Sequence, residues 1–175
     1  MTPPPLPLTL ERIASPVGEV LLMSDDAGRV RVLDFEDYAE RMARLLRRHY
    51  GPGGWSVREA VAPSVGRRAL EAYFAGDLAA IDSLETATAG TAFQRQVWSA
   101  LRTIPAGATT TYGALAARMD RPKAVRATGL ANGANPIGII VPCHRVVGAD
   151  GSLTGYGGGL ERKAWLLRHE GARTG

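Results

Sequence analysis

The chain has 175 residues, a mass of 18.6 kDa and a formal net charge of +4, so it can bury a sizeable core in one domain or in two small ones. Its single cysteine excludes an internal disulfide, and its three widely separated histidines give no spacing typical of a zinc site. Because no apolar run approaches the roughly 20 residues of a membrane span and the proline-rich start resembles no targeting peptide, we expect a cytoplasmic protein without metal, cofactor or membrane partner.

The first 50 residues predict strands followed by a helix. Residues 10–35 read as two or three short strands, and residues 25–28 (Asp-Asp-Ala-Gly) form a turn between two of them. This pattern predicts a β-hairpin. Apolar residues at helical spacing then predict a helix over 37–50, which the Gly-Pro-Gly-Gly run at 51–54 ends.

A second strand and helix complete the first half of the chain. Residues 55–61 are compatible with a strand, and Ser64 suits the N-cap of a helix that stops near Gly76. Residues 79–90 are rich in Ala, Thr, Ser and Asp and indicate a linker. We therefore predict two domains, at 1–90 and 91–175.

The second half begins with three helices. Residues 91–94 (Thr-Ala-Phe-Gln) fit a capping box, and an apolar face at helical spacing continues from there to Pro105. A short helix is predicted over 112–119, and Pro122 suits the first turn of a third helix. Two short helices joined by a tight turn indicate a helix-turn-helix.

The third helix carries a stripe of small side chains. Ala124, Ala127 and Ala131 follow one another at helical spacing, while Arg126 points away from the face formed by Val125, Gly129 and Asn132. Small residues allow another surface to approach closely. The stripe therefore fits packing against a neighbouring helix or contact with DNA, and the pattern alone leaves both open.

The only cysteine follows an apolar run. Residues 137–141 predict a strand, and Pro142 at its end would present Cys143 at a sheet edge with His144 beside it. A neighbouring imidazole can favour the nucleophilic thiolate. The alternative is an inert, buried cysteine that serves as a small hydrophobic side chain.

A glycine-rich loop and a final helix follow the cysteine. The run at 155–159 (Gly-Tyr-Gly-Gly-Gly) can fold over a ligand, but it lacks the residues of a phosphate-binding loop. The last helix is predicted over 160–170 and ends at Gly171. Glu170 lies at its C-terminal end, where an acidic side chain opposes the helix dipole, and the pattern alone leaves open a solvated helix end and a functional role.

Charge is divided unevenly between the two halves. Residues 1–90 hold 10 Arg or Lys and 13 Asp or Glu, whereas residues 91–175 hold 11 and 4, a net charge of +7. A basic module favours a polyanionic partner such as DNA or RNA. Arginine-rich solvated faces are also common, so charge alone leaves the partner open.

These motifs together resemble the alkylguanine-DNA alkyltransferases, the suicide DNA-repair proteins also called methylated-DNA–protein-cysteine methyltransferases. The resemblance covers nearly all of residues 91–171. The segments that carry it are Phe93-Gln94-Arg95-Gln96-Val97-Trp98, Thr111-Tyr112-Gly113, Lys123-Ala124-Val125-Arg126-Ala127, Asn135-Pro136, Pro142-Cys143-His144-Arg145-Val146-Val147, Gly155-Tyr156-Gly157-Gly158-Gly159-Leu160 and Trp165-Leu166-Leu167-Arg168-His169-Glu170-Gly171.

The resemblance implies a two-domain α/β protein of the single-module bacterial form. Its first domain would be a small β-sheet with helices, similar to ribonuclease H, and its second would be mostly helical with a helix-turn-helix. The family's zinc ligands, known from animal members, are missing here, so no metal is expected. Animal members also have a serine where this chain has Gly157. The glycine leaves more room in the pocket for larger alkyl groups.

The resemblance also implies the chemistry. Cys143 would accept the alkyl group, and a relay from Glu170 to His144 to water would take the thiol proton. A water is expected because adjacent residues of an extended segment point to opposite sides, which keeps His144 from touching the sulfur. Displacing guanine from an alkyl carbon requires such a soft nucleophile.

The resemblance implies further residue roles, assigned position by position. Tyr112 would help to rotate the damaged nucleotide and protonate the leaving base, and Arg126 would fill the vacated stack. Asn135 would tie the recognition helix to the active-site strand. The alanine stripe Ala124, Ala127 and Ala131 would enter the minor groove. The backbone carbonyls of Cys143 and Val146 would accept from the guanine amino group. The loop that closes the pocket would contain Tyr156 and Gly157, with Lys163 beside it.

We therefore expect a single-turnover protein that moves an alkyl group from the six-position oxygen of guanine, and also from the four-position oxygen of thymine, in double-stranded DNA to Cys143. We expect a monomer, with cooperative binding on DNA left open. Three alternatives remain: an alkyltransferase-like binder of damaged DNA, a sequence-specific DNA-binding regulator and a Cys-His-Glu hydrolase. The binder would lack the reactive cysteine, the regulator would depend on DNA sequence, and the hydrolase would turn over.

Overall fold

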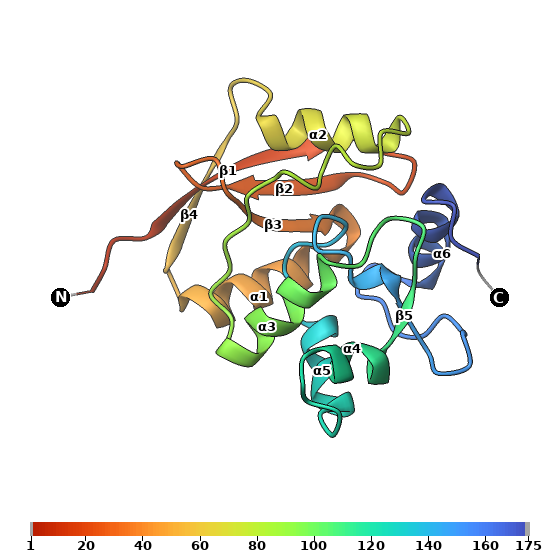
Figure 1. The fold of residues 1–175 in the computed structure, drawn as a ribbon. Coiled ribbons are helices and arrows are strands. Elements are labelled where there is room, and N and C mark those ends of the chain that lie inside the picture. The colour runs from red at the N-terminus through yellow and green to blue at the C-terminus, as the bar shows by residue number, and fades with distance from the viewer. Residues whose placement is uncertain (1, 174–175) are drawn as a thin grey trace. The chain divides into compact units, whose positions relative to one another are not determined.

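The computed structural model of the chain describes residues 2–173 and has an α/β fold. The chain divides into two compact units, Met1–Ala89 and Gly90–Gly175. Figure 1 shows the ribbon of both units.

The first unit contains a four-stranded mixed sheet. Its strands are β1 (Leu6–Ile13), β2 (Val20–Ser24), β3 (Val30–Phe35) and β4 (Trp55–Glu59), in the order β3-β2-β1-β4. β2 pairs antiparallel with both β1 and β3, while β4 pairs parallel with β1. The predicted hairpin turn is confirmed, because the Gly28 amide donates to the Asp25 carbonyl oxygen at 2.9 Å. The predicted strand after residue 55 is also confirmed, and it ends two residues early.

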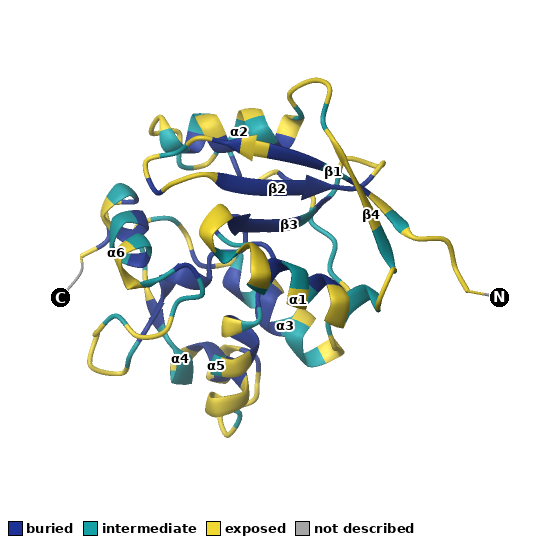
Figure 2. Cartoon of the chain, turned by 180° about the vertical axis from the view of Figure 1, so that it is seen from behind, coloured by how far each residue is buried: buried dark blue, intermediate teal, exposed yellow. Residues whose placement is uncertain are grey.

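Two helices cover the opposite faces of this sheet (Figure 1). The 3₁₀-helix η1 (Glu36–Tyr38) leads into α1 (Ala39–Tyr50), and α2 (Val65–Phe74) starts at the predicted N-cap, where the Ser64 hydroxyl accepts from the Arg67 amide. α1 buries Met42 and Leu46 against one face of the sheet. Figure 2 shows β2 buried along its length and β4 mostly exposed at the sheet edge.

The second unit is mostly helical. Its elements are α3 (Ala92–Leu101), β5 (Thr110–Thr111), α4 (Tyr112–Arg118), α5 (Val125–Gly133), η2 (Cys143–Arg145), β6 (Val146–Val147) and α6 (Leu160–His169). α3, α4 and α5 pack against one another, and η2 packs against α3 and α6. β5 and β6 form a short parallel pair that the sequence did not predict.

Local sequence explains where these helices begin. The predicted capping box at Thr91 and Gln94 is present in full and starts α3. The prediction that Pro122 lies in the first turn of the next helix was wrong, because residues 122 and 123 form a turn and α5 starts at Val125. In that turn the Ala124 amide donates to the Arg121 carbonyl oxygen, which holds the chain in a turn ahead of the helix.

The predicted strand at 137–141 was wrong, because this apolar run folds into consecutive buried turns. Asn135 is the physical reason. Its Oδ1 accepts from the Ile137 amide and its Nδ2 donates to the Val141 carbonyl oxygen at 2.8 Å, which folds the run back on itself. Ile139 adopts a left-handed conformation with φ of 67° inside this turn.

Candidate active site

Cys143 begins a 3₁₀-helix instead of following a strand. The residue is buried, with 7% exposure, and forms no disulfide. Successive side chains of a 3₁₀-helix are separated by about 120°, since it has about three residues per turn. Residues 143–145 are therefore not extended. The prediction that Cys143 and His144 point to opposite sides of an extended segment was wrong in this respect.

Behind the cysteine lies a buried group of three charged or titratable side chains from η2 and the end of α6. His144 Nε2 lies 3.0 Å from both carboxylate oxygens of Glu170. The Arg145 guanidinium donates to the same two oxygens, through Nε at 2.9 Å and an Nη at 2.8 Å, and its other Nη donates to the Ile104 carbonyl oxygen. His144 is 0% exposed, Arg145 3% and Glu170 4%. The structure thus brings together His144 and Glu170, as the sequence predicted.

The protonation states follow from these contacts. Burial raises the pKa of Glu170, but hydrogen bonds and charges from Arg145 and His144 outweigh burial and hold this pKa well below its ordinary value. Burial lowers the pKa of His144, and the hydrogen bond and charge of Glu170 oppose that shift only in part. A carboxylate only accepts, so Nε2 of the neutral imidazole carries the proton. Nδ1 of His144 is then the basic nitrogen, and it is buried without a hydrogen-bond partner among residues 2–173.

Sequence reasoning missed Arg145 as a site residue. Its place directly after Cys143 and His144 was the only available signal. That signal does not show whether the arginine is buried, so the sequence could not pair it with Glu170.

Lys163 is buried as well, with 0% exposure. Its Nζ donates to the carbonyl oxygens of Val146 and Thr154, each at 2.6 Å. Burial lowers the pKa of Lys163 to about 8, and the electrostatic influence of the nearby Cys143 opposes that shift only in part. Lys163 therefore joins α6, the strand after the cysteine and the loop that precedes Tyr156.

Two asparagines hold the backbone around the cysteine. Asn135 fixes the turn before it through Val141, so it does connect the end of α5 to the segment of Cys143, although that segment is not a strand. Asn132, on α5 itself, donates from Nδ2 to the Cys143 carbonyl oxygen at 3.4 Å. Asn132 was not predicted to have a functional role.

A cavity of about 470 Å³ lies on the α5 side of this group. It is mainly apolar and is bounded by α4, α5 and the glycine-rich loop. Its lining residues are Tyr112, Val125, Gly129, Asn132, Gly133, Gly155, Tyr156 and Gly157. Tyr112, which was predicted to protonate the leaving base, therefore lies around one cavity with Tyr156 and Gly157, which were predicted to contact the substrate. Asn132 links that cavity to Cys143.

The residues predicted to contact DNA differ in how far they are exposed. Arg126 and Ala127 are exposed on α5, and Ala124 is half-buried at its N-cap. Ala131 is only 3% exposed, and the Trp98 indole N–H donates to its carbonyl oxygen at 2.9 Å. For Ala131, helix packing is thus the observed environment.

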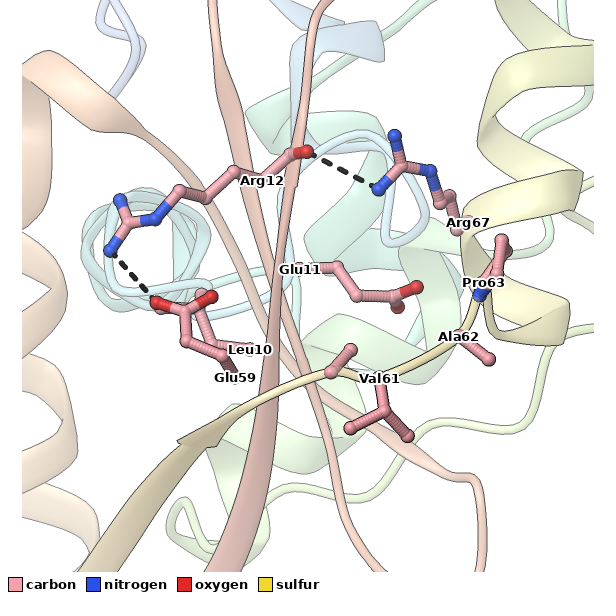
Figure 3. Close-up of a pocket in the computed structure, with 9 residues that line it drawn as sticks. Leu10, Glu11, Arg12, Glu59, Val61, Ala62, Pro63 and Arg67 are labelled. Carbon is pink, nitrogen blue, oxygen red and sulfur yellow. Dashed lines mark hydrogen bonds and ion pairs between the residues drawn. The ribbon is translucent and has the colours of Figure 1, made fainter.

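A second cavity, of about 340 Å³, lies in the first unit beside β1 and the start of α2 (Figure 3). The carboxylate of Glu11, which is buried at this cavity, accepts from the Ser64 amide and hydroxyl. Arg12 contacts Glu59, and Arg67 contacts Glu71 and the Arg12 carbonyl oxygen. These polar groups bond to one another, so this cavity offers no reactive group.

Residues 2–173 hold neither a cluster of metal-ligating side chains nor a membrane-spanning helix. That part of the chain contains no cluster of three or more His, Cys, Asp or Glu side chains able to hold a metal ion. None of its helices combines the length and the apolar character needed to cross a bilayer.

Known proteins share both the sequence and the fold. A family model described as the DNA-binding domain of 6-O-methylguanine DNA methyltransferase matches residues 92–172. Two relatives are named methylated-DNA–protein-cysteine methyltransferase. The one from Salmonella typhimurium is 54% identical over 95% of this chain and 97% of the relative, and the one from Methanosarcina acetivorans is 46% identical over 90% of this chain and 95% of the relative.

Solved structures give the same result. The O6-methylguanine methyltransferase of Mycobacterium tuberculosis is 42% identical, with a TM-score of 0.74 over 94% of this chain and 93% of that one. The Mycobacterium tuberculosis protein OGT in complex with DNA is 41% identical, with a TM-score of 0.77 over 95% and 94%. The matches extend over both units of the chain.

Proposed function

The chain belongs to the methylated-DNA–protein-cysteine methyltransferase family, and from that premise we propose that Cys143 is the residue that accepts the alkyl group. The activity is the direct reversal of DNA alkylation, a transfer from a methylated base to a protein cysteine. The relatives' names state this reaction, and one structural relative was solved with DNA. Each molecule would act once, because the thioether that forms on Cys143 is not cleaved by the same chemistry.

The observation that carries the assignment is the buried neutral imidazole beside the cysteine. His144 Nε2 donates to the ionised Glu170, and Nδ1 keeps its lone pair. In the proposed reaction a water passes the thiol proton of Cys143 to Nδ1, and Glu170 stabilises the resulting imidazolium. The charge pair of thiolate and imidazolium then forms next to a carboxylate that is already ionised.

The thiolate attacks the alkyl carbon on the six-position oxygen of guanine. A carbon–sulfur bond forms as the carbon–oxygen bond breaks, and the electron pair of the broken bond stays with the base. Tyr112, which lines the cavity, would give a proton to the departing guanine. The carbonyl oxygens of Cys143 and Val146 would accept from the base, while Tyr156 and Gly157 close the cavity over it. The fourth-position oxygen of alkylthymine would be a second substrate.

The fold supports a mode of DNA binding. We take α4 and α5 as a helix-turn-helix whose second helix enters the minor groove through Ala124 and Ala127. Arg126 is exposed next to this surface and would fill the stack when the damaged base is flipped out. The first unit would act as the ribonuclease-H-like companion domain of a monomeric two-domain protein.

A stoichiometry measurement tests the proposal. Duplex DNA with labelled methylguanine, in excess over protein, should transfer about one methyl group per chain, and peptide mapping should locate it on Cys143. Cys143→Ser should bind the duplex but take up no label. Methyl release in many-fold excess over protein would indicate a hydrolase instead. DNA binding without transfer would indicate a damage-recognition protein.

A further inference from the structure

Leu130 is a large apolar side chain that the proposed chemistry does not use. It is 70% exposed, whereas the other exposed large apolar side chains of the second unit, Val125 and Leu160, are 40% and 49% exposed. Single apolar side chains on a protein surface are ordinary, so exposure alone assigns no role to Leu130. Its position on α5 supplies the further evidence.

α5 has a buried face and an exposed face. The buried residues of the helix are Thr128, Ala131 and Asn132. Exposed residues follow one another on the opposite face at spacings of three and four, namely Arg126, Ala127, Leu130 and Gly133. Since two of these four are alanine and glycine, Arg126 and Leu130 carry the two long side chains of this face. Ala127, through which α5 is proposed to enter the minor groove, lies beside them.

Basic side chains accompany this face. Arg121 and Lys123 are exposed just before α5, and Arg126 lies one helical turn before Leu130. Residues 91–175 carry a net charge of +7. A protein partner is recognised by a continuous apolar patch, and one leucine among cations does not form such a patch. Double-stranded DNA combines phosphates with apolar surfaces inside its groove, so its chemistry matches this face.

The size of the groove gives an exposed leucine a task. The minor groove of B-DNA is about 6 Å wide, whereas an α-helix with its side chains is about 10–12 Å across. A helix can therefore enter only where the groove has been widened. Proteins that bind the minor groove often widen it with an apolar side chain, leucine included, that wedges between base steps and bends the duplex.

We propose that Leu130 inserts into the minor groove as an apolar wedge and bends the duplex beside the damaged nucleotide. The inference rests on the proposed function, in which α5 enters that groove. Four residues of an α-helix rise by about 6 Å and neighbouring base pairs are about 3.4 Å apart, so the wedge lies within about two base steps of Arg126. The bend opens the groove for α5 and weakens the stacking of the damaged base. Leu130 is thus a positioning residue.

Binding and bending are measured together to test this role. A Cys143→Ser background prevents transfer, and the probe is a duplex with one methylguanine and a dye at each end. Leu130→Ala should weaken binding by at least about tenfold, because burying a leucine side chain is commonly worth that factor. It should also reduce the bend that energy transfer between the dyes reports. The slope of log affinity against log salt concentration should not change, since an apolar contact releases no counter-ions.

Three further variants test whether the apolar character of Leu130 is what matters. Leu130→Met keeps a long apolar side chain and should retain most of the affinity and the bend. Leu130→Gln has a similar length but a polar end, so it should behave like Leu130→Ala. Val65→Ala removes another exposed apolar side chain, 73% exposed on α2, and should bind and bend DNA as the native protein does. Substitutions at such exposed positions leave the fold intact.

Each result has one interpretation. A native bend in Leu130→Ala would overturn the inference whatever its affinity, and so would a native bend in Leu130→Gln. A smaller salt dependence in Leu130→Ala would also overturn it, because α5 would then have moved away from the phosphates. With Cys143 intact, Leu130→Ala should accept methyl from the free base as fast as the native protein. Absence of any transfer by the native protein would instead contradict the proposed function.

Discussion

The carboxylate of Glu170 accepts from two consecutive residues, His144 and Arg145, and this shared use makes Arg145 a positioning residue for the proposed relay. The guanidinium fork fixes both oxygens of Glu170, which in turn orient the imidazole. With His144 neutral, the group has no net charge. The positive charge of Arg145 also disfavours a second positive charge on His144.

Replacing Arg145 with Gln should therefore raise the pKa of His144, because Glu170 would pair with the imidazole alone. More His144 would be protonated at neutral pH and unable to act as a base, so the pH–rate profile of alkyl transfer should move to higher pH. Single-turnover rates across pH measure this. Arg145→Lys keeps the charge and should move the profile less.

Loss of a buried ion pair can also weaken the fold in general, so a control is needed. Arg41→Gln removes the pair with Asp34 in the first unit, where the two groups lie 2.8 Å apart and the Asp34 side chain is 5% exposed. This variant should leave the pH–rate profile in place. An unshifted profile in Arg145→Gln would show that Arg145 has only a structural role.

The sequence indicated Cys143, His144 and Glu170 because short motifs and a helix end draw attention to them. Arg145 was missed because its partner is 25 residues away, and sequence alone does not distinguish one buried arginine from many exposed ones. Asn132 was missed for a similar reason. Its contact with the Cys143 carbonyl depends on how the turn before the cysteine folds.

At the scale of elements, local rules predicted those helices that have a cap. The capping box at Thr91 and the N-cap at Ser64 supply hydrogen bonds within three residues, so a short sequence window contains the whole signal. The run at 137–141 has no such local signal. A short apolar run fits a buried strand or a buried turn equally, and here the side chain of Asn135 decides between them.

The exposed start of α5 allows a direct test of its proposed role. Arg126→Ala should slow repair in duplex DNA by more than about tenfold, roughly 1.4 kcal/mol, because the vacated stack is no longer filled. The free alkylated base needs no flipping and should be affected less. Single-turnover rates on both substrates measure the difference.

A matched variant controls for loss of charge. Arg168→Ala removes another exposed arginine of the second unit, on α6, and should not separate duplex from free base. If Arg126→Ala slows both substrates equally, Arg126 contributes to folding or chemistry and not to flipping.

At the scale of the whole molecule, the buried histidine makes stability depend on pH. Burial lowers the pKa of His144 in the folded protein, so the unfolded chain binds a proton more readily. Stability is therefore full above the ordinary pKa of histidine, about 6.5, and is lost as pH falls through that value toward the lower folded pKa. Glu170 contributes with the same sign at more acidic pH, because its folded pKa is also lowered.

Hydrogen exchange of the amides at 143–147 should therefore become faster, relative to the intrinsic rate, as pH falls from about 7 to 5. His144→Gln should reduce this dependence in the same peptide. His49 in the first unit also has a pKa lowered mainly by burial, so that unit should keep its own acid sensitivity in the variant. A pH-independent exchange in the native second unit would contradict the neutral, buried state of His144.

The position of β1 has a consequence for synthesis on the ribosome. β1 lies between β2, its hairpin partner, and β4, which pairs with it only after about 40 intervening residues have been made. Until β4 emerges, a strand destined for the interior of the sheet has an open edge, and open edges template pairing with other chains. The nascent chain therefore passes through an aggregation-prone interval that ends only when Trp55–Glu59 leaves the exit tunnel.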